Sequence, residues 1–146
     1  MLLNEEQRMI QETARAFAKE EIAPNVVAWE EAEHIPEDIF QRFGEMGFLG
    51  MTISEQWGGA ATDNVCLAIV VEEISAADGA AGLLVGMQNS VVCGPLDQFG
   101  SDRQKEHYLR PAISGELKGC FCLTEPQAGS DASNLMTRIE PKGNGY

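Results

Sequence analysis

Residues 122–131 read Cys-Leu-Thr-Glu-Pro-Gln-Ala-Gly-Ser-Asp and mark the point where the character of the chain changes. The segment carries two hydroxyls (Thr124 and Ser130), two carboxylates (Glu125 and Asp131) and a glycine within ten positions. A hydroxyl and free backbone amides at the end of a strand suit recognition of a heterocycle edge or a phosphate. The same composition also fits an ordinary connection, in which the hydroxyls bond to nearby backbone groups. The residues alone leave both readings open.

The flanks of this loop predict strands. Residues 118–123 alternate and are rich in strand formers, and residues 135–141 place apolar side chains on one face. Residues 142–145 read Lys-Gly-Asn-Gly, a strong hairpin-turn signal. No return strand follows before Tyr146, so we expect the sequence to be truncated or one part of a longer protein.

The preceding residues predict a series of helices, so the expected fold is mainly α. Capping residues mark the helix starts: Asn4, Thr62 or Asp63, Asp78 and Ser101. Residues 48–53 form a short apolar run that is expected to be extended. The sequence therefore predicts an all-α domain over 1–116, followed over 117–146 by the first strands of a β-domain.

One predicted helix, about residues 79–98, is apolar almost all round, which indicates burial on every side. Small residues recur along it at Gly82, Gly86, Ser90 and Gly94. They allow either close helix packing or space for something that is not protein.

Composition excludes several classes of partner. Lys and Arg number 10 against 23 Asp and Glu, a net charge of −13, so no excess of cations is available to neutralise a nucleic acid. The longest stretch without charge holds Gly, Gln, Asn, Ser and Pro, which is unlike a membrane span. The four cysteines form no C-x-x-C motif, which argues against a metal site. Cys120 and Cys122 are expected to be small buried thiols in a reducing cytoplasm.

Residues 122–131 closely resemble the first flavin-site motif of the acyl-CoA dehydrogenase family. The pattern is matched except at Asn134, where the family has a small residue, and Gln127 stands where glycine is common. Other parts are similar to the family in the same order along the chain: the opening helix at 4–24, the Gly-Gly loop at 57–59, the last N-terminal helix at 99–117 and the turn at 142–146. The resemblance covers nearly the whole chain.

The resemblance implies a three-domain enzyme, usually a homotetramer or dimer, that binds FAD and oxidises an acyl-CoA to the trans-2-enoyl-CoA. A carboxylate removes the α-proton while a hydride leaves the β-carbon for the flavin, and the electrons pass to an electron-transferring flavoprotein. By position, the cofactor residues are Phe121, Leu123, Thr124, Gly129 and Ser130, and Ser130 also touches the acyl-CoA. Candidates for the wall of the acyl chain are Leu84, Met87 and Val91, for which plain core packing is the alternative.

No catalytic residue is assigned, because the family places its base on a C-terminal helical bundle; Glu125, held extended before Pro126, is better read as structural. Two other functions stay open. One is an enzyme of the same fold with another outcome, such as an acyl-CoA oxidase or a flavin monooxygenase. The other, if the gene ends at Tyr146, is a non-catalytic helical binding or assembly module.

Overall fold

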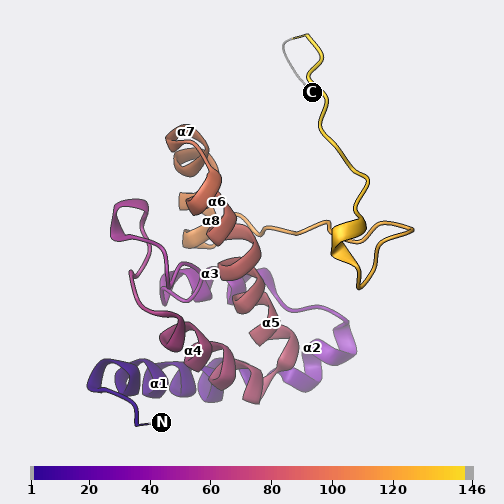
Figure 1. Cartoon of the computed structure of the whole chain (residues 1–146). Helices are drawn as coiled ribbons and strands as arrows, with labels where there is room; N and C mark the ends of the chain where they lie inside the picture. The colour runs from indigo at the N-terminus through magenta and orange to yellow at the C-terminus, as the bar shows by residue number, and fades with distance from the viewer. Residues whose placement is uncertain (1, 144–146) are drawn as a thin grey trace.

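A computed structural model describes residues 2–143 and confirms a mainly helical chain (Figure 1). Helices occupy the first four fifths of the sequence, and residues 115–143 lead away from them with little regular structure apart from a short helical turn at 132–134. The α-helices are α1 (Glu5–Phe17), α2 (Val26–Ala32), α3 (Glu37–Glu45), α4 (Asn64–Ala77), α5 (Gly79–Met87), α6 (Gly94–Phe99), α7 (Asp102–Gln104) and α8 (Arg110–Ser114). The described residues also form the 3-10 turns η2 (Glu55–Trp57) and η5 (Ala132–Asn134), together with the π-helical turns described below.

The predicted capping residues begin the helices. Asn4 and Gln7 form a capping box at α1, and Ser101 forms one with Gln104 at α7. Asp63, not Thr62, caps α4 by accepting from the amide of Cys66 at 2.8 Å. Each of these side chains satisfies a backbone N–H that the first helical turn leaves without a partner.

Three π-helical turns each end two residues before a proline. They are η1 (Ala18–Ile22) before Pro24, η3 (Gln88–Cys93) before Pro95 and η4 (Lys105–Leu109) before Pro111. The residue before each proline donates its N–H to the carbonyl five residues back. A proline ring clashes with the carbonyl four residues back in a regular α-helix, and the wider turn relieves that clash. The chain from 79 to 99 therefore stays continuously helical through Pro95.

Aromatic side chains from separate helices form the centre of the main core. The ring centroids of Phe17 and Phe43 lie 5.6 Å apart, and Phe48 meets Phe17 edge-on at 5.8 Å. Residues 48–53, expected to be extended, instead form a series of turns in which Phe48, Leu49, Met51 and Ile53 are buried. That expectation was wrong. A turn can bury apolar side chains when its backbone N–H and C=O groups are hydrogen-bonded by buried side chains of other elements.

The helix over 79–99 is not buried on every side. Leu83 is 62% exposed and Met87 39% exposed, although Ala81 and Val85 on the opposite face are fully buried. Gly82 permits close packing, since a Cβ there would lie 1.9 Å from Ser75 Oγ, whereas Gly86 faces a more open space. The face of this apolar helix that carries Leu83 and Met87 is therefore not covered by the helical core.

The predicted strands at 118–123 and 135–141 are not formed. Among the described residues of this region, the only β-bridge between two identified residues is the isolated bridge between Glu125 and Ala128. A strand is defined by its neighbour, and neither segment has a partner strand beside it among residues 2–143. The predicted hairpin turn at 142–145 lies partly outside the described residues.

The cysteines that precede the loop are also placed differently from expectation. Cys120 and Cys122 are exposed, with their Sγ atoms 4.0 Å apart, while Cys66 and Cys93 are buried. Cys120 and Cys122 lie on the extended segment that no strand covers, so their thiols are not enclosed as predicted.

Candidate functional site

The loop after residue 123 is organised around the side chain of Glu125. The carboxylate accepts from the backbone N–H of Met136 at 2.8 Å and of Thr137 at 2.9 Å, and also from the side-chain amide of Gln127. Glu125 and Ala128 exchange two backbone hydrogen bonds of 3.1 and 3.0 Å. Residues 124–137 thus close on themselves, with Ala128 buried at the centre.

These contacts change the acidity of Glu125. Hydrogen bonding from Thr137, followed by that from the Met136 amide, lowers the pKa of the carboxyl to about 2. Hydrogen bonds to the charged form stabilise that form, so the group stays ionised at any ordinary pH. Its oxygens are occupied by loop amides, so in this arrangement Glu125 holds the loop together and is not placed to accept a proton from a substrate.

Acidification is expected to open this loop only at very low pH. The pKa of Glu125 in the folded chain lies below its ordinary value of 4.5. The stabilisation that the ionised carboxylate gives to the loop is therefore fully present above pH 4.5 and is lost as the pH falls through about 2. The amide proton resonances of Met136 and Thr137 should titrate with that midpoint in NMR spectra. The Glu125→Gln variant is the matched control and should lack this step. A midpoint near 4.5 in the parent chain would contradict the assigned contacts.

The predicted cofactor residues lie on one exposed segment. The Phe121 ring is 50% exposed, and Leu123, Thr124, Gly129 and Ser130 are exposed as well. Within residues 2–143, neither the hydroxyl nor the amide of Thr124 makes a hydrogen bond. A Cβ placed on Gly129 would meet no atom within 4 Å. An apolar ring, a neighbouring hydroxyl and amide, and open space beside a glycine fit a flat heterocycle with a polar edge, as in FAD.

An apolar groove of about 520 Å³ runs between α4 and α5. Met87 lines it together with Leu67, Val71 and Leu83, and small residues such as Gly86 leave it open. Of the predicted acyl-chain wall, Met87 lies here. Val91 lines a separate hollow of about 450 Å³ with Phe121 and Cys120. Leu84 is half-buried and lines neither hollow, so the structure does not bring Leu84, Met87 and Val91 together.

The large apolar residues that line the groove beside Met87, which are Leu67, Val71 and Leu83, were not predicted from the sequence. Leu83 is four positions before Met87 and therefore shares its helix face, a signal that the sequence did contain. Leu67 and Val71 come from α4, and nothing in the linear sequence pairs their face with that of Met87. Their side chains are brought to the groove by the packing of α4 on α5.

The described residues show neither a membrane-spanning helix nor a metal-binding cluster. No helix among them is long and apolar enough to cross a membrane. They also contain no group of three or more His, Cys, Asp or Glu side chains that could hold a metal ion.

Comparison with known proteins identifies the family of the helical part. The sequence profile described as "Acyl-CoA dehydrogenase, N-terminal domain" matches residues 4–116. A probable acyl-CoA dehydrogenase of Bacillus subtilis, YngJ, is 38% identical over 144 residues, which are 99% of this chain and 38% of that protein. Subunit CarC of the caffeyl-CoA reductase–Etf complex of Acetobacterium woodii is 35% identical over 147 residues, covering 100% of this chain and 39% of the subunit.

Solved structures agree with the sequence comparison. A glutaryl-CoA dehydrogenase of Mycobacterium smegmatis, in complex with FADH2, superposes with a TM-score of 0.91 at 33% identity, over 97% of this chain and 36% of that one. The chain thus spans less than two fifths of the length of these relatives. The profile match, the identity along nearly the whole chain and the shared fold together show that this chain belongs to the acyl-CoA dehydrogenase family.

Proposed function

We propose that the protein containing this chain is an FAD-dependent acyl-CoA dehydrogenase that oxidises an acyl-CoA to the trans-2-enoyl-CoA by α-proton abstraction and β-hydride transfer to the flavin. The chain supplies the N-terminal helical domain, 1–116, and the first part of the middle domain, 117–146. The observation that carries this proposal is the exposed segment 121–131 directly after a family helical domain. The related structure in complex with FADH2 supports FAD as the cofactor.

Each cofactor residue has a physical role in this proposal. FAD, when bound, supplies the hydride acceptor. Phe121 and Leu123 lie along its ring, and the amide and hydroxyl of Thr124 bond to its polar edge. Gly129 and Ser130 continue the site, and Ser130 also contacts the acyl-CoA. The described residues supply no catalytic base in this proposal, since Glu125 is engaged by the loop amides.

The acyl chain is assigned to the groove between α4 and α5. Its apolar lining suits a hydrocarbon, and the volume of the Met87 side chain would limit how far the chain reaches. Leu84 and Val91 remain candidates for the same wall; their positions outside the groove make Met87 the residue best supported by the geometry.

The proposal extends to partners and compartment. The acyl-CoA is the substrate, and an electron-transferring flavoprotein is the electron acceptor, in line with the relative that is a subunit of a reductase–Etf complex. A homotetramer or dimer is the expected assembly. The cytoplasm is the proposed compartment, in keeping with four cysteines that form no disulfide.

Anaerobic titration tests this function. The product of the complete gene, loaded with FAD, is mixed with a panel of acyl-CoAs while the visible absorbance of the oxidised flavin is followed. Bleaching by at least one saturated acyl-CoA, with the enoyl-CoA as product, supports the dehydrogenase. A protein that binds no flavin, or whose flavin no acyl-CoA reduces, refutes it.

The same titration separates other functions. Because CarC is named as part of a reductase complex, reduction of an enoyl-CoA is a second candidate. It would show as reoxidation of the pre-reduced flavin by enoyl-CoAs, without bleaching by saturated ones. Rapid reaction of the reduced flavin with oxygen would indicate an oxidase or a monooxygenase. A non-catalytic helical module would show none of these reactions.

Removing the Thr124 hydroxyl is expected to weaken the flavin site. In the complete gene product, Thr124→Ala should lower flavin affinity or slow flavin reduction, at a cost of about 1–3 kcal/mol for a lost bond to a buried polar edge. Thr13→Ala, at an exposed position on α1, is the matched control. Flavin affinity and reduction rate both equal to the parent would remove Thr124 from the proposed site.

A further inference from the structure

We propose that Gln88 is a positioning residue: its buried side-chain amide fixes the segment that carries Phe121 and Thr124 against the helix that carries Met87. This inference rests on the proposed function and adds a residue that the motif comparison did not single out. Gln88 makes no hydrogen bond to the described loop 124–137 and does not itself line the groove, so any effect it has on the flavin acts through the chain it holds.

The Gln88 amide uses both of its N–H donors and its carbonyl oxygen on three backbone groups. The side chain is 2% exposed. Nε2 donates to the carbonyl of Ala112 and to that of Leu117, both at 2.9 Å, and Oε1 accepts from the N–H of Gly119 at 3.1 Å. One side chain thereby joins η3, the end of α8 and the segment 117–119. No other natural side chain of this length offers two donors and an acceptor in one plane.

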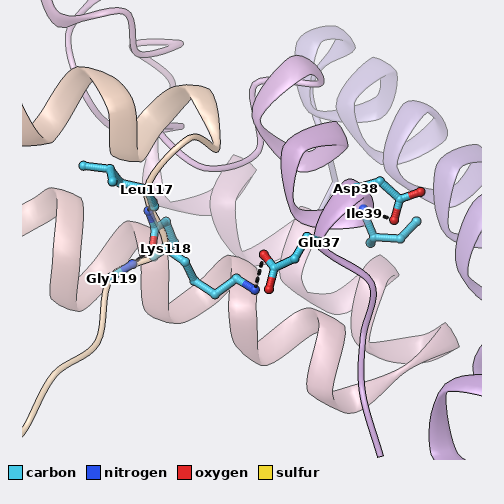
Figure 2. A network of polar contacts seen from close by, with 7 residues as sticks. Glu37, Asp38, Ile39, Leu117, Lys118 and Gly119 are labelled. Atoms are coloured by element: carbon cyan, nitrogen blue, oxygen red, sulfur yellow. Dashed lines mark hydrogen bonds and ion pairs between the residues drawn. The ribbon is translucent and has the colours of Figure 1, made fainter. Parts of the chain in front are cut away.

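Further contacts hold the same segment. Lys118 Nζ lies 2.9 Å from the Glu37 carboxylate, as Figure 2 shows, and 5.0 Å from the ring centroid of Phe40. Gly119 packs tightly on η3, since a Cβ there would lie 2.4 Å from Val92 Cγ1. The ion pair is exposed and contributes little to stability. We call these contacts of residues 117–119 the anchor, and Gln88 is its buried part.

The anchor is close to the flavin segment in the chain. Gly119 precedes Phe121 by two residues, a span of about 7 Å when extended. Met87, immediately before Gln88, lines the groove assigned to the acyl chain. The same turn of helix therefore sets the position of the acyl groove and of the segment that meets the flavin. Their relative placement decides whether the reacting carbon lies within range of the flavin, and a shift of about 1 Å can cost up to a hundredfold in rate.

The test compares three variants of the complete, FAD-loaded gene product by anaerobic stopped flow with an acyl-CoA that bleaches the parent. Gln88→Met keeps the shape of the side chain and removes its three hydrogen bonds. Gly119→Ala keeps Gln88 but pushes the segment away from Val92. Gln41→Met, at an exposed position of α3, is the matched control.

The proposal expects slower flavin reduction, by about tenfold or more, in both Gln88→Met and Gly119→Ala. The dissociation constant for acyl-CoA should stay within about threefold of the parent, and the visible spectrum of the bound flavin should shift. Gln41→Met should match the parent in all three measurements. If Gln88→Met does not fold, Gly119→Ala alone decides the outcome by the same criteria.

A parent-like reduction rate and flavin spectrum, with only a lower unfolding temperature, would overturn the proposal, because a merely structural glutamine would change stability alone. Failure of the proposed function is seen separately, in the parent protein itself. A parent that binds no flavin or is not bleached would overturn both inferences, whereas a bleached parent with unaffected variants would overturn only this one.

Discussion

Replacing Phe43 with alanine is expected to lower the free energy of unfolding by about 3–5 kcal/mol, the usual cost of removing a buried aromatic ring. Phe43 is 0% exposed and its ring lies 5.6 Å from that of Phe17, so its removal leaves a cavity inside the core. The loss comprises the transfer energy of the ring and the cavity that remains. Urea denaturation of the 146-residue chain, followed by far-UV circular dichroism, measures it.

Phe99→Ala is the matched control, because Phe99 is also a helical phenylalanine but is 78% exposed. Its substitution should change the free energy of unfolding by less than about 0.5 kcal/mol, as for most surface positions. Similar losses in both variants would show that the core is not centred on α1 and α3 as described.

Asn89→Ala is expected to cost about 3 kcal/mol of unfolding free energy, because it strands buried backbone groups. The amide Oδ1 accepts from Met51 N–H at 2.9 Å, and Nδ2 donates to the carbonyls of Phe48 at 2.7 Å and Val85 at 2.8 Å. Asn89 is 2% exposed, so these backbone groups are shielded from bulk water. The Met51 N–H and the Phe48 carbonyl lie in the buried turns of 48–53, which offer them no regular secondary structure.

Ser90→Ala, one position further along the same π-helical turn, separates this effect from a change in the helix itself. Ser90 is exposed, and among the described residues its hydroxyl bonds only to the Gly86 carbonyl of its own helix. Its substitution should leave the denaturation midpoint within the error of the measurement. A loss from Asn89→Ala no larger than that from Ser90→Ala would rule out its role as the link to the 48–53 turns.

Much of the helical part could be predicted, since its signals are local. Asn4, Asp78 and Ser101 cap helices within three residues of themselves, so neighbours in the sequence determine the outcome. Gly115 ends α8 with φ of 86°, a conformation that glycine adopts without strain. The positions of the prolines were visible as well, but the π-helical turns before them were not predicted.

The predictions that were wrong concern segments whose conformation depends on residues distant in the sequence. The strands expected at 118–123 and 135–141 needed a partner strand, and composition cannot provide one. The apolar residues of 48–53 resemble a strand, but the segment forms turns, and two of its backbone groups, the Phe48 carbonyl and the Met51 N–H, are bonded by Asn89, 38 positions from Met51. Leu84, Met87 and Val91 stand at i, i+3 and i+7 and would share one face of a regular α-helix. The structure places Val91 one turn further along, in the π-helical turn η3, where it lines a different hollow from Met87.

The helix starts and stops, the family likeness and the short motif proposed to meet a flavin could be predicted from the amino acids alone, because each depends on residues close together in the chain. Which side chains share a surface followed from the fold. Gln88 and Asn89 read as two polar residues in an apolar helix; packing against α8, the 48–53 turns and the 117–119 segment makes them the buried links between those parts. The physical reason is that a buried amide must find partners, and the fold brings those partners within reach.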